Sequence, residues 1–139
     1  MDKQIIATER APAAVGPYSQ GVRVGGLVFT AGQIGLVPGS KEFAGPDVES
    51  QTRQALENLQ AILEEAGSCL RHAVKTTVYL ADLADFGPMN GVYAEFFPQE
   101  PPARATLQAA ALPLGALVEI EVVAEACDCE KEDPECHCC

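Results

Sequence analysis

The sequence predicts an α+β domain in which one sheet carries two helices on a single face. Three observations support this prediction. Strand-like runs rich in β-branched residues lie near both ends of the chain, two amphipathic helical segments lie between them, and a further strand-like run separates the two helices. The expected order is β-β-α-β-α-β-β, and an order of this kind builds one sheet with its helices on one side.

The first two strands are expected over about residues 18–24 and 27–34. Gly25 and Gly26 separate them, and a Gly-Gly pair between two β-rich runs is a hairpin signal because both residues tolerate positive φ. Residues 1–10 are able to add a short strand at the edge of the sheet. The N-terminal part of the domain is therefore expected to be a hairpin with one possible extra strand.

Two helices are expected after this hairpin. The clearer one covers residues 47–66, where apolar residues recur at helical spacing along one stripe. Asp47 is a natural N-cap for it, and Gly67 is suited to a C-terminal cap. The second helix covers roughly residues 83–97 and carries a one-sided cluster of large apolar side chains: Phe86, Met89, Tyr93, Phe96 and Phe97.

Three more strands complete the prediction, at residues 73–82, about 103–111 and about 117–125, with a short linker before the last one. In the last strand Glu119 and Glu121 alternate with apolar residues, as expected for a strand with one buried face. No helix remains to cover the other face of the sheet. Aromatic content is only 6% and tryptophan is absent, so a monomer is expected to expose apolar β-surface. This predicts a homo-oligomer that buries that surface.

Length and charge limit the possible functions. The 139 residues suffice for one domain, expected over residues 1–125, followed by an acidic, cysteine-rich tail over residues 126–139. The formal net charge of −11 opposes binding to nucleic-acid backbones or anionic membranes. No apolar run approaches the roughly 18 residues of a membrane span, and the N-terminus lacks the apolar core of a secretion signal. A cytoplasmic location is therefore expected.

The tail concentrates thiols that are able to bind a soft metal such as zinc or copper(I). These metal-ligand candidates are Cys127, Cys129, Cys136, Cys138 and Cys139. The alternative is a disordered acidic end whose thiols stay reduced in the cytosol. No metal site is expected within the domain itself, because no spaced set of histidines and carboxylates is present there.

Arg104 is the only charged residue between Glu100 and Glu119, in a run that otherwise resembles a buried strand. A strand places Arg104, Thr106 and Gln108 on one face. Such an arginine is often paired with a carboxylate of the same protein. No acid lies within reach on the same segment, however, and a fork-shaped donor without a close partner suits a carboxylate ligand.

Three other residues are weaker candidates when taken alone. Glu119 fits either a solvated face or a group that orients water or moves a proton. Tyr18 follows a Gly-Pro turn and also fits an aromatic residue packed on the core. Asn90 lies within a predicted helix, where asparagine is unfavourable, and it fits either solvent exposure or a bond to a neighbouring loop. The domain has one histidine and one cysteine before the tail, so a Ser-His-Asp or Cys-His set is not expected. An arginine, a carboxylate, backbone groups and water suit the hydrolysis of a compound that is already reactive.

Six segments in order along the chain resemble the Rid/YjgF family of reactive-intermediate deaminases. They are APAAVGPYSQGV, TAGQIG, VKTTVYLADLADF, MNGVYAEFFP, PPARATLQAAALP and VEIEVVA, and the match as a whole runs from about residue 5 to residue 125. The resemblance implies a chorismate-mutase-like fold assembled as a homotrimer, with active sites in clefts between subunits. It implies hydrolysis of 2-imino acids such as 2-iminobutanoate and 2-iminopropanoate to 2-keto acids and ammonia, which protects pyridoxal-phosphate enzymes, with no cofactor.

The resemblance also implies roles for individual residues. Arg104 matches the carboxylate-binding arginine and Glu119 the glutamate of the cleft, and these two form the expected catalytic pair. The other expected substrate-binding residues are Tyr18, Gly32, Asn90 and Thr106. The chain departs from many members at Ala31, where they have serine, and from some bacterial members at Thr106, where they have cysteine. Both differences concern substrate preference and leave the arginine in place.

Strand geometry restricts how this pair is able to meet. If the strands at 103–111 and 117–125 formed a hairpin, Arg104 would lie about 16 Å from Glu119 along the pair, at about 3.3 Å per residue. A small imino acid does not span that distance. Either the two strands are not hairpin partners, or Arg104 and Glu119 meet across a subunit boundary.

A ligand-binding or regulatory trimer without turnover is the alternative function. RNA cleavage, which has also been attached to this family, is disfavoured by the net charge and by the lack of a histidine pair.

Overall fold

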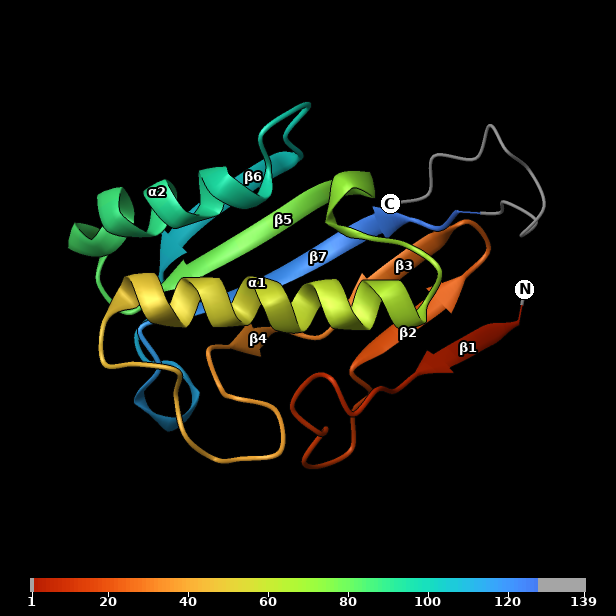
Figure 1. Ribbon diagram of the computed structural model, residues 1–139, viewed down its shortest axis with the longest axis horizontal. Coiled ribbons are helices and arrows are strands. Elements are labelled where there is room, and N and C mark those ends of the chain that lie inside the picture. The colour runs from red at the N-terminus through yellow and green to blue at the C-terminus, as the bar shows by residue number, and fades with distance from the viewer. Residues whose placement is uncertain (1, 128–139) are drawn as a thin grey trace.

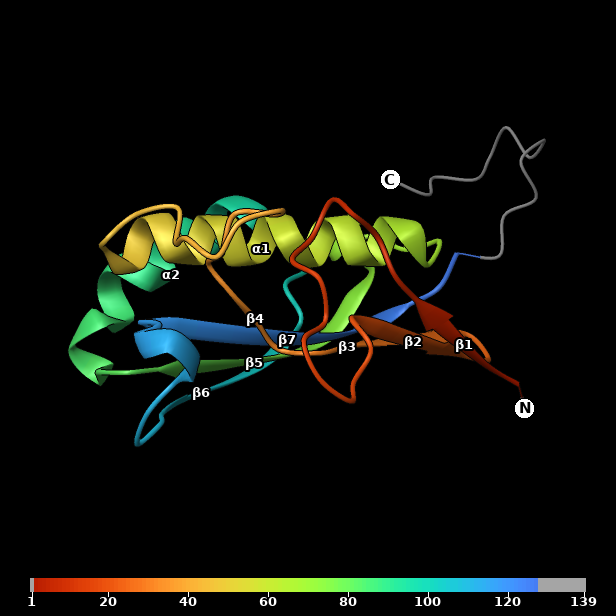
Figure 2. The ribbon, with the colours of Figure 1, turned by 90° about the horizontal axis from the view of Figure 1, so that it is seen from below.

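The computed structural model describes residues 2–127, which form one sheet covered on one face by two helices. The strands are β1 (Lys3–Ile6), β2 (Gly21–Val24), β3 (Leu27–Thr30), β4 (Gln33–Ile34), β5 (Ala73–Leu80), β6 (Ala103–Gln108) and β7 (Val118–Glu125). The helices are α1 (Val48–Glu65) and α2 (Phe86–Phe96), with 3-10 turns η1 (Leu70–His72), η2 (Leu83–Asp85) and η3 (Pro113–Gly115). Figure 2 shows both helices on the same side of the sheet, so the predicted α+β layering is confirmed.

The order of strands in the sheet is β1-β2-β3-β7-β5-β6, and β4 also pairs with β7. β5 and β6 run parallel, and all other neighbours run antiparallel. In Figure 1, β7 crosses the middle of the sheet, β1 lies at one edge and β6 lies beyond β5 at the other. The last strand of the described chain is therefore central.

The core lies between the sheet and α1. Alternation along β7 buries Val118, Ile120 and Val122 beneath the helices, as predicted. The stripe on α1 supplies Leu56, Leu59, Ile62 and Leu63, which have no exposed surface. Burying side chains of this size contributes about 1.5–3 kcal/mol each, so this layer is the main source of stability.

The ends of α1 follow from its sequence. The Asp47 side chain accepts a hydrogen bond from the Ser50 backbone N–H at 2.7 Å, which confirms the predicted N-cap. Gly67 has a φ of +79°, the left-handed conformation that ends helices and favours glycine. The second helix differs from its prediction, because residues 83–85 form the turn η2 and α2 begins at Phe86.

Two strand predictions change in detail. The expected strand 27–34 divides into β3 and β4, and β4 reaches β7 directly. The strand expected over residues 73–82 ends at Leu80, and Val74 near its start is 42% exposed, because the register between β5 and β7 shifts between Ala73 and Lys75.

The face of the sheet away from the helices is apolar in part, and no element of residues 2–127 covers it. Ile5, Val22, Phe29 and Val123 lie opposite one another across four neighbouring strands and form a row on this face. Ile5 and Phe29 are exposed, as is Leu107 on the far strand β6. We call this surface the open face. Among the described residues, no helix is long and apolar enough to cross a membrane.

Candidate active site

Arg104 lies near the start of β6 and points toward α2. Its Nη1 donates a hydrogen bond to Oδ1 of Asn90 at 2.8 Å. Its guanidinium carbon lies 4.6 Å from the centre of the Tyr93 ring and 5.4 Å from that of Phe86. Within residues 2–127 no carboxylate forms an ion pair with Arg104, so the guanidinium is stabilised by contacts with one amide and two aromatic rings.

The structure brings Asn90 and Arg104 together, as two of the predicted site residues. Asn90 lies one turn after Phe86 on α2, so both side chains reach the strand from the same face of the helix. Asn90 is half-buried and uses its carbonyl oxygen to orient the guanidinium. This leaves most of the Arg104 N–H groups without a bond to the described part of the chain, which suits a bidentate anion.

Thr106 lies two residues after Arg104, on the same face of β6. Its hydroxyl oxygen is buried and has no hydrogen-bond partner among the described residues. A buried hydroxyl without a partner is costly by about 1–3 kcal/mol. The structure therefore puts the hydroxyl near the Arg104 cluster but directed into the protein.

Glu119 lies on β7 and packs closely against Gly32. A Cβ built on Gly32 would lie 2.9 Å from Cδ of Glu119 and 3.0 Å from its Oε1, so only glycine allows this approach. Partial burial raises the pKa of the Glu119 carboxyl, and the neighbouring charge of Glu121 raises it further. A carboxylate in this environment is a better proton acceptor than one in water.

Tyr18 belongs to the loop that leads into β2, and it is 53% exposed. Its hydroxyl accepts a hydrogen bond from the Val15 backbone N–H at 3.2 Å. The loop contacts the segment before Gly32, because the Ala31 N–H donates to the Gln20 carbonyl at 2.8 Å. Tyr18, Gly32 and Glu119 therefore come from adjoining segments, separate from the Arg104 cluster.

Arg104 and Glu119 point to opposite faces of the sheet in one protomer. In the register of the sheet, Thr76 of β5 lies opposite Arg104 and Tyr79 of β5 lies opposite Glu119. Thr76 is buried on the helix side, and positions three residues apart along a strand face opposite ways. β6 and β7 are not hairpin partners, because β5 lies between them. The hairpin geometry considered from the sequence does not occur.

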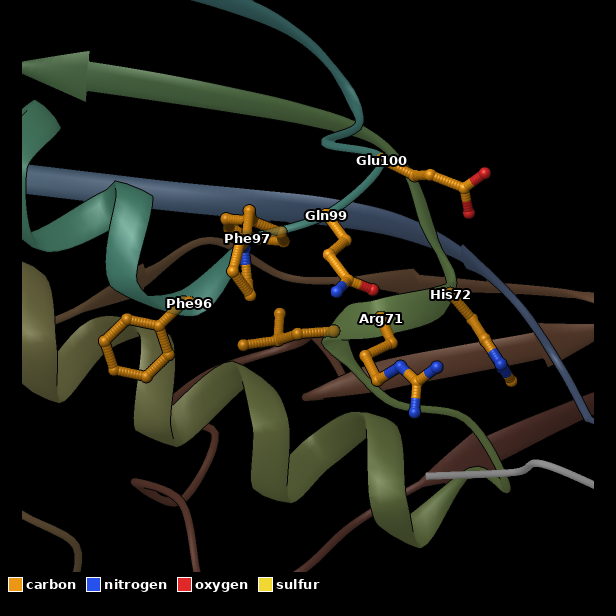
Figure 3. Close-up of a pocket in the computed structure, with 8 residues that line it drawn as sticks. Arg71, His72, Phe96, Phe97, Gln99 and Glu100 are labelled. Atoms are coloured by element: carbon orange, nitrogen blue, oxygen red, sulfur yellow. The ribbon is translucent and has the colours of Figure 1, made fainter.

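A hollow of about 270 Å³ lies elsewhere, between η1 and the end of α2 (Figure 3). Arg71 and His72 line it from the turn before β5, and Phe96 and Phe97 line it from the end of the helix. None of the predicted site residues contributes to it. We therefore do not assign it to the candidate active site.

The cysteines differ from expectation where the structure describes them. Cys69 and Cys127 are both disulfide-bonded. Cys127 is therefore neither a reduced thiol nor a thiolate metal ligand in this structure, which corrects both predictions at that position. The other tail candidates, Cys129, Cys136, Cys138 and Cys139, lie outside the described residues. Residues 2–127 contain no group of three or more metal-ligating side chains.

The sequence reasoning missed the aromatic residues around Arg104. Phe86 and Tyr93 were expected only as apolar residues of the second helix. Their spacing carried a signal, because Phe86, Asn90 and Tyr93 follow one another at intervals of four and three and share a helix face. A polar residue on an otherwise aromatic face indicates a bond to a group on the facing strand.

Known proteins resemble this chain over most of its length. A sequence model of the family described as "Endoribonuclease L-PSP" matches residues 8–126. "Reactive Intermediate Deaminase A, chloroplastic" of Arabidopsis thaliana is 50% identical over 122 residues, which cover 88% of this chain and 65% of that protein. The protein named "2-iminobutanoate/2-iminopropanoate deaminase" of Mus musculus is 48% identical over 122 residues, which cover 88% of this chain and 90% of that protein.

Solved structures give the same result. The structure described as "Crystal structure of E. coli TdcF with bound serine" has a TM-score of 0.84 and 44% identity, and the match covers 88% of this chain and 98% of that one. The chain therefore belongs to the family described as Endoribonuclease L-PSP, and its predicted resemblance to the Rid/YjgF reactive-intermediate deaminases is confirmed.

Proposed function

We propose that the protein hydrolyses small 2-imino acids, such as 2-iminobutanoate and 2-iminopropanoate, to 2-keto acids. Water adds to the C=N carbon and one of its protons passes to the nitrogen, which gives a carbinolamine. The C–N bond then breaks as the carbinolamine hydroxyl becomes the keto group, and the hydroxyl proton leaves with the nitrogen as ammonia. The observation that carries the proposal is the Arg104 guanidinium, which contacts Asn90 and two rings and forms no ion pair with a carboxylate of the described residues. The name of the mouse relative supports the same substrates.

Arg104 binds the carboxylate of the substrate in this proposal. A guanidinium presents parallel N–H donors that match both oxygens of a carboxylate. Asn90 fixes one edge of the guanidinium at 2.8 Å and leaves the remaining donors for the substrate. The bound imine is thereby oriented for attack, and positioning accounts for most of the rate enhancement that a reactive imine requires.

Glu119 holds the attacking water and accepts its proton. Burial and Glu121 raise the pKa of Glu119, so its carboxylate accepts a proton more readily than an exposed one. Backbone groups near Gly32 and Thr106 orient the imine nitrogen, and Tyr18 closes the site. No step of this hydrolysis requires a metal or an organic cofactor.

We further propose that the site forms between subunits of a chorismate-mutase-like homotrimer. In one protomer Arg104 and Glu119 point to opposite faces of the sheet, so one protomer does not offer both to a small substrate. Asn90, Arg104 and Thr106 of one subunit then face Tyr18, Gly32 and Glu119 of the next. The exposed apolar residues of the open face, such as Phe29 and Leu107, give the assembly a surface to bury.

The substrates arise as enamines and imines released by pyridoxal-phosphate dehydratases acting on threonine or serine. Removing them protects pyridoxal-phosphate enzymes from damage, and a cytoplasmic location is part of this proposal. We do not propose RNA cleavage in spite of the family description, because the net charge of −11 opposes binding to a phosphate backbone.

The second candidate is a ligand-binding or regulatory trimer of the same fold without turnover. The relative crystallised with bound serine favours it, because serine is a stable amino acid and not an imine. Both functions use Arg104 to bind a carboxylate. They differ in whether Glu119 supports hydrolysis, and turnover therefore discriminates between them.

The test generates 2-iminobutanoate enzymatically and follows its disappearance with wild type, Arg104→Ala and no protein. We expect wild type to accelerate the loss of the imine and Arg104→Ala to match the protein-free rate. Equal rates for wild type and Arg104→Ala would refute the deaminase function. If wild type binds 2-ketobutanoate but leaves the imine decay unchanged, the ligand-binding function is supported in its place.

A further inference from the structure

The Arg104 guanidinium lies close to two aromatic rings that differ in burial. Tyr93 is 5% exposed and Phe86 is 39% exposed, so Tyr93 forms the buried side of this arrangement and Phe86 the solvent side. Tyr93 is also the nearer ring, at 4.6 Å against 5.4 Å from the guanidinium carbon. The face of an aromatic ring attracts a cation without neutralising it, whereas a carboxylate would compete with an anionic ligand.

Tyr93 is itself fixed from two sides. Its hydroxyl shares a hydrogen bond of 2.8 Å with the hydroxyl of Thr76, and both groups are buried. Its ring packs against Phe97 with the ring centres 4.5 Å apart. Thr76 also lies opposite Arg104 in the register of β5 and β6, so one pair of strands sets the positions of both the ring and the guanidinium.

We propose that Tyr93 is a positioning residue, whose ring, packed against Phe97, holds the Arg104 guanidinium in the orientation that binds the substrate carboxylate. The identity of that ligand, a small 2-imino or 2-keto acid, rests on the proposed function. The alternative is that Tyr93 only fills the core beneath α2. Two variants separate the ring from the hydroxyl: Tyr93→Phe keeps the ring, and Tyr93→Leu removes it.

A first measurement needs no ligand. The side-chain NMR resonances of Arg104, identified by comparison with Arg104→Ala, experience the ring currents of the adjacent aromatic rings. We expect Tyr93→Phe to retain the upfield shift that these currents cause. We expect Tyr93→Leu to lose most of it, with Phe86 still in place. An unchanged Arg104 spectrum in Tyr93→Leu would overturn the proposal.

A second measurement follows function through the affinity for 2-ketobutanoate by calorimetry and through KM and kcat for 2-iminobutanoate. We expect Tyr93→Leu to weaken the affinity and raise KM by about five- to tenfold, as the loss of a cation–π contact implies, with a smaller change in kcat. We expect Tyr93→Phe to stay within about twofold of wild type.

Leu59→Ala provides the matched control, because Leu59 is fully buried in the core on α1, whereas the partners of Arg104 lie on α2. It destabilises the fold and is expected to leave the affinity unchanged. Equal losses in Leu59→Ala and Tyr93→Leu, or in both Tyr93 variants, would overturn the proposal. A wild type that never hydrolyses the imine would refute the proposed function, whereas the NMR comparison still decides the role of Tyr93.

Discussion

Asn90→Asp is the sharpest single test of how Arg104 is used. The change replaces an amide with a carboxylate of the same shape, at an oxygen that lies 2.8 Å from Nη1 of Arg104. The fold is expected to tolerate it, because the new carboxylate forms an ion pair with the guanidinium. The charge at the site changes, because Arg104 acquires a carboxylate partner, which it lacks among the described residues of the wild type.

The magnitude follows from Coulomb's law. A substrate carboxylate on the other edge of the guanidinium would lie about 5 Å from the introduced one. Two like charges at this separation repel by roughly 3 kcal/mol at an effective dielectric constant of about 20. That repulsion corresponds to a loss of about 100-fold in the affinity for a carboxylate. Asn90→Ala removes the anchor without adding charge, so we expect it to cost only about threefold to tenfold.

Calorimetric titration with 2-ketobutanoate measures these affinities, and the kcat/KM for 2-iminobutanoate gives the parallel kinetic value. Thermal unfolding is measured alongside, and the melting temperature of Asn90→Asp is expected to equal or exceed that of wild type. The predicted order of affinity is wild type, then Asn90→Ala, then Asn90→Asp. The reasoning is refuted if Asn90→Asp binds 2-ketobutanoate as tightly as wild type does.

Four further predictions concern Glu119, Gly32 and the open face. Glu119→Gln is expected to lower kcat at least 100-fold and to change 2-ketobutanoate affinity less than threefold; comparable losses in both would contradict a role in proton transfer. Since folding raises the pKa of Glu119, this residue makes the free energy of unfolding of the wild type fall as pH rises above the ordinary carboxyl pKa of 4.5. Glu119→Gln should lose this pH dependence in unfolding curves recorded between pH 4 and 7. Gly32→Ala forces a Cβ against the Glu119 carboxylate and should lower kcat about tenfold, whereas Gly26→Ala, whose added Cβ would meet no atom within 4 Å, should leave it unchanged. Phe29→Glu adds charge to the open face and should shift the protein from oligomers to monomers in sedimentation velocity. The control Leu83→Glu, at an exposed position beside α2, should leave the oligomer unchanged. Oligomers of unchanged size in Phe29→Glu would exclude this face as the interface.

Local patterns carried most of the fold prediction. The stripe on α1 and the alternation on β7 predicted both elements to within one or two residues, because burial on one face imposes a period that a single segment displays. The cap at Asp47 followed from side-chain chemistry in the same way. These features depend on neighbours in the sequence, so the sequence alone suffices for them.

Pairing between distant segments was beyond the same reasoning. Nothing within the strand at Ala103–Gln108 indicates that it runs parallel to β5, and its burial alternates only weakly. The neighbours of Arg104 come from α2, and they depend on how that helix rotates against the sheet. Arg104 was found because its charge was isolated in the sequence, whereas Tyr93 was missed because an aromatic residue in a helix ordinarily belongs to the core.

The central place of β7 has a consequence for biosynthesis. A nascent chain that has not yet released residues 118–125 from the ribosome holds two groups of strands, β1-β2-β3 and β5-β6, without the strand that lies between them in the sheet. Both groups then present open edges on which other polypeptides are able to pair. The sheet is completed late, when β7 is inserted, and the nascent chain is most prone to aggregation before that step.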